Sequence, residues 1–305
     1  MFFQQLRTFV ISAKFENFSR AADTLHLTQS AVTHQIKLLE EHFGLKLYHR
    51  HRRGIRLTDE GRKLLEHARE ILAGVRDMEE LARSLQGRDN VSLSIAAHRG
   101  MVRYRLPDVI KAFRTRYIGA NITIFTRVVD DDIIGLVMSG EADFGIVTSW
   151  NTFRQIHFHE FVSYDMMLCV GDQYRAEHPR IHWDRLSLEE IAAVPLVLYE
   201  KVNPIRRGID RVFEEHHLTP RVIIEIGGPD ILLEYARIGL GVSIISALPL
   251  HHRKIEGVKV IPVTHYFGRL GYGVIYRQDK YFSPALVDFL SILDPQLVVD
   301  GRLPR

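Results

Sequence analysis

The N-terminal segment contains three helical stripes, and one tight connection between them constrains the fold more than any other feature. The apolar positions that repeat at helical spacing are Leu6, Phe9, Val10 and Ala13, then Ala21, Ala22 and Leu25, then Ala31, Val32, Ile36 and Leu39. Ser19 suits the N-cap of the second helix, and Thr28 suits that of the third. Because only residues 25–28 join these two helices, the spacing predicts a helix-turn-helix.

The outward face of the third predicted helix is polar and rich in hydrogen-bond donors. In a helix-turn-helix, the start of this helix reaches base edges in the major groove. Gln side chains pair with adenine, Ser and Thr serve several bases, and Lys suits phosphate. A plain three-helix bundle with a solvated face would show the same pattern, so spacing alone leaves both readings open. The candidate DNA-reading residues are Gln29, Ser30, Thr33, His34 and Lys37.

A basic turn follows the three helices. Residues 45–48 and 55–58 are predicted to be two short strands joined by a Gly-containing turn, which together would form a wing. Residues 1–63 carry 11 Lys and Arg against 6 Asp and Glu, a net charge of +5, whereas the rest of the chain sums to −2. A basic segment on a near-neutral body favours contact with a polyanion. The residues expected to line a DNA backbone are Arg50, Arg52, Arg53 and Arg56.

Together, residues 18–40, 44–50 and 57–61 resemble the signature of the LysR-type transcriptional regulators. The resemblance implies a winged helix-turn-helix over residues 1–58 that binds double-stranded promoter or operator DNA. By this resemblance Gln29, Ser30, Thr33 and Lys37 fall at DNA-reading positions, and Arg50 and Arg53 at wing positions. His34 departs from the family pattern, in which many members carry Arg, and this departure weakens a guanine or phosphate contact.

Residues 59–87 are predicted to form one long linker helix. Its apolar residues alternate by four and three, as in the seam of a coiled coil: Leu64, Ala68, Ile71, Val75, Met78, Ala82 and Leu85. The stripe favours dimerisation, although it would also serve to pack on the chain's own core. The resemblance implies a homodimer or homotetramer.

From residue 88 to 305 the apolar period changes repeatedly between strand and helix. This alternation predicts parallel βαβ units and an overall α/β fold class. Two α/β subdomains are expected, residues 91–163 with 265–305, and residues 164–264. The resemblance implies an effector-binding domain of periplasmic-binding-protein type.

Ligands of open α/β sheets bind beyond the carboxyl ends of strands. This rule nominates four loops that would face each other across a cleft between the subdomains. The effector is expected to be a small molecule. Arg99 suits a carboxylate through paired hydrogen bonds, which favours an anionic effector, although a surface salt bridge is an alternative role for this residue. The candidate effector-binding residues are His98, Arg99, Gly100, Met101, Thr148, Ser149, Tyr199, Lys201, Gly228 and Asp230.

Within the family, residues 103–111, 142–144 and 237–242 resemble the branch that controls cysteine biosynthesis and sulfur assimilation. That branch has Thr and Gln where this chain has His98, Gly100 and Met101. The hydroxyl and amide contacts to sulfate or acetylserine are therefore missing here, which counts against the same effector, although His98 and Arg99 would still suit an anion.

Several other classes of function find no support in the sequence. No nucleophile elbow, phosphate-binding loop or zinc spacing predicts an enzyme, a cofactor or a metal site. A solute-binding protein would explain the C-terminal half alone, but the basic N-terminal segment and the lack of a visible signal peptide oppose it. The run Asp130, Asp131 and Asp132 is expected to cap a helix rather than to form an acid pair. The single cysteine, Cys169, is expected to be a core thiol, and a cytoplasmic protein without a membrane span is predicted.

Overall fold

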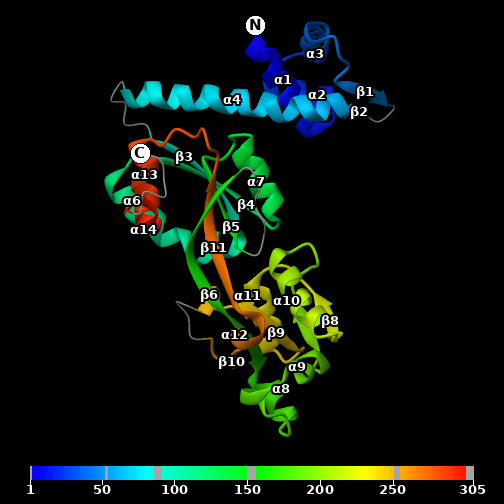
Figure 1. Cartoon of the computed structure of the whole chain (residues 1–305), viewed down its shortest axis with the longest axis vertical. Helices are drawn as coiled ribbons and strands as arrows, with labels where there is room; N and C mark the ends of the chain where they lie inside the picture. Colours follow the sequence, from blue (N-terminus) through cyan, green and yellow to red (C-terminus); the bar gives the residue numbers. More distant parts are fainter. Residues whose placement is uncertain (1, 52–53, 86–90, 150–155, 251–254, 300–305) are drawn as a thin grey trace. The chain divides into compact units, whose positions relative to one another are not determined.

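The computed structural model describes residues 2–51, 54–85, 91–149, 156–250 and 255–299 (Figure 1). The chain divides into two compact units, mainly residues 1–88 and 89–305. The first unit contains helices and a two-stranded hairpin, and the second is built on a nine-stranded sheet. The predicted mixed α/β fold class is therefore confirmed.

The N-terminal unit begins with three helices around one apolar core. Thr28 caps the third helix as predicted, accepting a hydrogen bond from Ala31 N at 3.2 Å. The second helix begins one residue before Ser19, and its N-cap is Asn17, whose side chain accepts from the amides of Ser19 and Arg20. The N-cap prediction for Ser19 was therefore wrong, because burial of Phe18 in the core starts the helix earlier. The helices and strands of this unit are α1 Phe2–Phe15, α2 Phe18–Leu25, α3 Gln29–Phe43, β1 Tyr48–His51, β2 Gly54–Leu57 and α4 Asp59–Leu85.

The wing hairpin starts later than predicted. Gly44 ends α3 with a left-handed backbone, φ 65°. The Glu40 carboxylate then accepts a hydrogen bond from Leu47 N at 2.9 Å. Residues 45–47 are therefore held as the exit of the helix rather than as a strand. The antiparallel hairpin runs from Tyr48 opposite Leu57 to His51 opposite Gly54.

The apolar stripe of α4 divides into two parts. Leu64 and Ala68 pack with the core of the N-terminal unit. Ile71, Met78 and Leu85, spaced by seven residues, are 44%, 64% and 78% exposed. The start of the stripe thus serves the chain's own core, and the rest presents an unpartnered apolar seam within the described part of the unit.

The C-terminal unit arranges its strands in the order β4-β3-β5-β11-β6-β9-β7-β8, with β10 pairing with β6. β3 is parallel to β4 and β5, and β7 is parallel to β8 and β9. This arrangement confirms parallel pairing on each side of the sheet. The strands are β3 Ser92–His98, β4 Asn121–Arg127, β5 Phe144–Thr148, β6 His157–Gly171, β7 Leu196–Leu198, β8 Val222–Glu225, β9 Val242–Ser246, β10 Val258–Pro262 and β11 Arg269–Tyr276.

Two long antiparallel strands, β6 and β11, join the two sides of this sheet (Figure 1). Residues 157–165 of β6 pair with β11, and residues 166–171 pair with β9 and β10. Residues 157–165 carry charged and polar side chains among apolar ones, whereas residues 166–170 are all apolar.

The helices of the C-terminal unit cover the sheet and begin at several strand ends. Apolar side chains from both sides of the sheet join one large core. The helices are α5 Arg99–Tyr104, α6 Leu106–Arg116, α7 Asp130–Met138, α8 Asp172–Glu177, α9 Leu188–Ala193, α10 Pro204–Glu215, α11 Pro229–Arg237, α12 Thr264–Phe267, α13 Pro284–Leu293 and α14 Gln296–Val299, with 3-10 turns at Trp183–Arg185 and Leu248–Leu250.

Candidate functional site

Helix α3 presents the predicted DNA-reading residues on its outward face. Its inward residues Val32, Ile36 and Leu39 are buried. Lys37 lies 3.4 Å from Glu41, but both side chains are well exposed, so this pair is weak and leaves the ammonium free to meet phosphate. The outward residues are Gln29, Ser30, His34 and Lys37, all exposed, and Thr33, which is half-buried.

The orientation of α3 is fixed by contacts at its start and along its buried side. The turn before it holds His26 in the left-handed region, φ 54°. The hydroxyl oxygens of Thr28 and Ser30 are 2.9 Å apart. On the other side, the buried Thr8 hydroxyl donates to the side-chain carbonyl of Gln35 and ties α3 to α1. These contacts hold the first turn of α3 in one position.

The wing is anchored to the same core. Tyr48 Oη donates to Phe9 O at 2.7 Å, and burial raises the pKa of this phenol well above its usual range. Ile55 N donates to Glu16 O at 3.0 Å. A Cβ on Gly54 would lie 2.6 Å from Glu16 O, so only glycine fits this contact.

Of the four predicted wing arginines, Arg56 is exposed on β2, and Arg50 lies in β1. The predictions for Arg52 and Arg53 lie outside the described residues.

The C-terminal unit contains a cavity of about 300 Å³ at the carboxyl ends of several strands. Six of the predicted effector residues line it: His98, Arg99, Gly100, Thr148, Tyr199 and Gly228. Glu200, Gly227 and Pro229, which lie in the nominated loops 199–201 and 227–230, also line it. The wall further contains residues that were not predicted, namely Arg127, Val128, Asn203, Pro204, Ile205, Ile226, Ile231, Ser246, Leu248 and Tyr272.

Four predicted effector residues do not line the cavity. Met101 is fully buried in the apolar core. Ser149 is bonded to the backbone of Gly271, donating its amide at 2.8 Å and accepting at its hydroxyl at 3.1 Å. Lys201 is exposed beside the cavity residues, and Asp230 pairs with Arg103 at 3.0 Å.

A buried polar cluster forms one wall of the cavity. Asp130, which is fully buried, accepts a hydrogen bond from Thr148 Oγ1 at 2.9 Å and bonds to His98 Nε2. Asp130 begins α7 but binds these two neighbours, so its predicted role as a simple helix cap was incomplete. Because a buried carboxylate must be satisfied by donors, this cluster fixes the orientations of His98 and Thr148.

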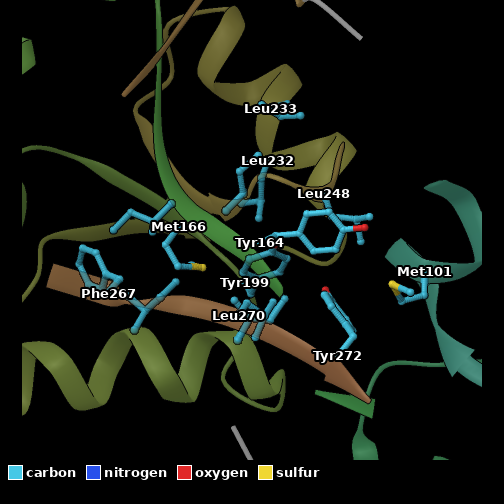
Figure 2. Close-up of a cluster of buried hydrophobic side chains, with 14 of the residues drawn as sticks. Met101, Tyr164, Met166, Tyr199, Leu232, Leu233, Leu248, Phe267, Leu270 and Tyr272 are labelled. Atoms are coloured by element: carbon cyan, nitrogen blue, oxygen red, sulfur yellow. The ribbon is translucent and has the colours of Figure 1, made fainter. Parts of the chain in front are cut away.

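The cavity wall also contains large apolar and aromatic side chains, and Tyr272 is paired in register with Thr148 on the neighbouring strand. Tyr199, Tyr272 and Leu248 belong both to the cavity wall and to the buried cluster drawn in Figure 2. Burial raises the pKa of Tyr199 well above its usual range, so the phenol is neutral. Its hydroxyl has no hydrogen-bond partner among the described residues.

The sequence contains signals for some of the lining residues that were not among the candidates. Arg127 ends strand β4, so the rule about strand ends applies to it as it does to His98 and Thr148. Glu200 lies between Tyr199 and Lys201, which were both predicted. Asn203 is the N-cap of α10 and accepts from Ile205 N at 2.9 Å.

No group of three or more His, Cys, Asp and Glu side chains is placed to hold a metal ion within the described ranges. Within the same ranges, no helix combines the length and apolar character that crossing a membrane requires.

Comparison with known proteins gives the family. Residues 3–62 match the bacterial regulatory helix-turn-helix proteins of the lysR family, and residues 86–297 match the LysR substrate binding domain. The regulator CysB of Burkholderia cenocepacia is 27% identical over 296 residues, covering 95% of this chain and 92% of that protein. The RuBisCO operon transcriptional regulator of Allochromatium vinosum is 27% identical over 293 residues, covering 92% of each.

Solved structures share the fold. CbnR in complex with its target DNA has a TM-score of 0.63 at 22% identity, covering 97% of this chain and 99% of that one. A full-length OxyR variant from Pseudomonas aeruginosa has a TM-score of 0.72 at 19% identity, covering 98% and 95%. The matched families describe regulators, not enzymes or solute-binding proteins. The chain therefore belongs to the LysR family of DNA-binding transcriptional regulators, with an N-terminal helix-turn-helix and a C-terminal effector-binding domain.

Proposed function

We propose that the outward face of α3 reads operator sequence while the wing holds the DNA backbone. The observation that carries this proposal is the row of exposed polar side chains on a helix whose other face is buried. In this assignment α3 contributes base contacts through Gln29, Ser30, Thr33 and His34, and a phosphate contact through Lys37. The wing contributes backbone contacts through Arg50, Arg52, Arg53 and Arg56.

The cavity of the C-terminal unit is the site for the small-molecule effector. Its volume suits a small metabolite, and it combines apolar walls with a few polar groups. Arg99 and Arg127 supply positive charge, so the effector carries an anionic group. The relatives named CysB support a place near that branch. Because His98, Gly100 and Met101 replace the Thr and Gln of that branch, the ligand differs.

The protein acts in the cytoplasm as a homodimer or homotetramer joined through the seam of α4. In this assignment residues 1–58 bind DNA, residues 59–87 link and dimerise, and residues 88–305 bind the effector in two subdomains. Effector binding changes the arrangement of the oligomer and therefore the length of the DNase footprint or the bend in the DNA.

A selection from a random double-stranded DNA library with the full chain tests the DNA assignment. Binding of the selected fragment and of a scrambled copy is then measured by fluorescence anisotropy over a range of salt. Gln29→Ala should weaken binding to the selected fragment by about 1–3 kcal/mol and leave binding to the scrambled copy nearly unchanged. Arg56→Ala should weaken both alike and lower the salt slope by about 1.

Arg114→Gln serves as the control, because Arg114 is an exposed residue of α6 in the other unit. Equal losses on both DNAs for Gln29→Ala would contradict the division between base reading and backbone contact. Failure of the selection to enrich any sequence would contradict sequence-specific binding itself.

A further inference from the structure

We propose that the cavity binds a zwitterion of the free α-amino acid class, in which one end carries a carboxylate and the other an ammonium group. This inference rests on the proposed function of the cavity as the effector site. It goes further by assigning the ligand a positive charge as well as a negative one, and by naming the side chain that receives each.

The cavity wall holds charges of both signs that are not paired with each other. Arg99 and Glu200 both line the cavity and are both exposed to solvent. Within the described residues, neither side chain makes an ion pair or a side-chain hydrogen bond. Asp230 pairs with Arg103 at 3.0 Å, and its Oδ1 lies 3.1 Å from the position that a Cβ on Gly228 would take.

These two charges flank neighbouring residues of one loop. Arg99 Nη1 lies 3.5 Å from the position that a Cβ on Gly228 would take. The Glu200 carboxylate oxygens lie 3.8 Å from the position that a Cβ on Gly227 would take. Because both loop residues are glycines, a ligand can approach their backbone closely between the cation and the anion.

Coulomb energies favour a ligand with both charges over one with a single charge. Like charges repel each other and opposite charges attract, and both effects are stronger near a protein surface than in bulk water. A purely anionic ligand bound at Arg99 would meet this repulsion from Glu200. A purely cationic ligand at Glu200 would meet it from Arg99 and Arg127. A zwitterion gains an attraction at each end and avoids both repulsions.

Arg127 strengthens the anionic end. It donates Nη1 to Thr126 O at 2.9 Å, and its guanidinium carbon lies 5.9 Å from the centre of the Phe125 ring. Neither partner is an acid, so the positive charge of Arg127 is not neutralised by them. Two arginines therefore attract the carboxylate, and Glu200 attracts the ammonium group.

Tyr199 in the cavity wall supplies an independent sign of a missing polar partner. Tyr199 is 1% exposed, and its hydroxyl is unbonded within the described residues although it lies in the cavity wall. A buried hydroxyl without a partner is unfavourable, so a polar substituent on the ligand that bonds to it improves binding. An amino acid can supply this partner through a polar side chain or through its α-carboxylate.

The test is isothermal titration of the full-length protein with twenty free L-amino acids, their N-acetyl derivatives and their α-amides. The N-acetyl derivatives lack the ammonium charge, and the amides lack the carboxylate charge. At least one free amino acid should bind, and its N-acetyl and amide derivatives should each bind at least tenfold more weakly.

Two variants test which side chain binds the ammonium end of the ligand and which binds the carboxylate end. Glu200→Gln should weaken binding of the free amino acid at least tenfold and change binding of its N-acetyl derivative less than threefold. Arg99→Gln should weaken the free amino acid by a similar factor and spare the amide. The matched controls Glu214→Gln and Arg114→Gln change exposed residues outside the cavity wall and should leave all affinities unchanged.

The proposal is overturned if no free amino acid binds, if an N-acetyl derivative binds as tightly as its parent, or if Glu200→Gln has no effect on a bound amino acid. These outcomes leave the DNA measurements untouched, so they are distinct from failure of the proposed function. If an N-acetylated acid binds and also shifts the DNase footprint, the cavity is an effector site but not one for zwitterions.

Discussion

Replacement of Thr148 by valine removes one hydroxyl from the polar wall of the cavity and leaves the side-chain shape nearly unchanged. Thr148 is 1% exposed, and its Oγ1 donates to Asp130 Oδ2 at 2.9 Å. Asp130 is fully buried, so its carboxylate depends on protein donors such as Thr148. The variant therefore leaves a buried carboxylate with one partner fewer.

The size of the effect follows from these contacts. A hydrogen bond to a charged group contributes about 1.5–3 kcal/mol to stability. Thr148→Val should therefore lower the free energy of unfolding by about 2 kcal/mol. Thr148→Ser keeps the hydroxyl and loses one buried methyl group, which lowers that free energy by about 0.8 kcal/mol. Serine at this position should thus be better tolerated than valine, although valine is closer in shape.

Urea unfolding of the full-length protein, followed by tryptophan fluorescence, measures this difference. The two tryptophans, Trp150 and Trp183, both belong to the C-terminal part of the sequence, and Trp183 is buried. Their fluorescence therefore reports on the unit that contains Thr148. With a slope of about 3 kcal/mol per molar urea, the valine variant should unfold about 0.7 M earlier than the parent.

The serine variant separates the contribution of the hydroxyl from that of the side-chain shape. If Thr148→Val unfolds at the same urea concentration as the parent, or at a higher one than Thr148→Ser, the hydroxyl does not stabilise Asp130. The reasoning about the polar wall would then be refuted.

Two further predictions concern the thiol and the long helix. Burial raises the pKa of the Cys169 thiol to about 12, so at pH 8 only about one thiol in ten thousand is ionised. The folded protein should therefore resist Ellman's reagent until urea exposes the thiol. Fast labelling of the folded protein would contradict this. Met78→Glu places a charge in the exposed seam of α4 and should lower the mass seen by analytical ultracentrifugation, whereas Glu66→Lys, on the same helix but off the seam, should not; equal masses for both variants would exclude the seam as the interface.

Local signals predicted the N-terminal unit well. Thr28 caps α3 and the apolar stripes pack together, because both depend on residues close in sequence. Ser19 failed as a cap because Asn17 offers an acceptor to two amides and places Phe18 inside the core. Which of two neighbouring residues becomes the N-cap therefore depends on which side chain is buried in the core.

The cavity was predictable only in part. The rule about strand ends located His98, Thr148, Tyr199 and Gly228, because backbone topology alone brings strand ends together. It also selected Met101, whose side chain turns into the apolar core. Side-chain direction follows from packing between distant segments, and a strand pattern does not contain that information. Glu200 lies in the nominated loop 199–201 but was not singled out, because the role of an exposed acid depends on its neighbours Arg99, Gly227 and Gly228 in the folded chain.

The crossing strands give the C-terminal unit a modular architecture. Residues 166–268 form one continuous segment that lies between Asp165 and Arg269. These two residues are paired opposite each other in the sheet and form an ion pair at 3.2 Å. Met166 N also donates to Gly268 O across the same junction. A segment whose two ends meet in this way can be exchanged as a cassette. Gene recombination at these two points would replace half of the cavity wall while leaving Arg99 and Thr148 in place, so ligand preference can change in one step.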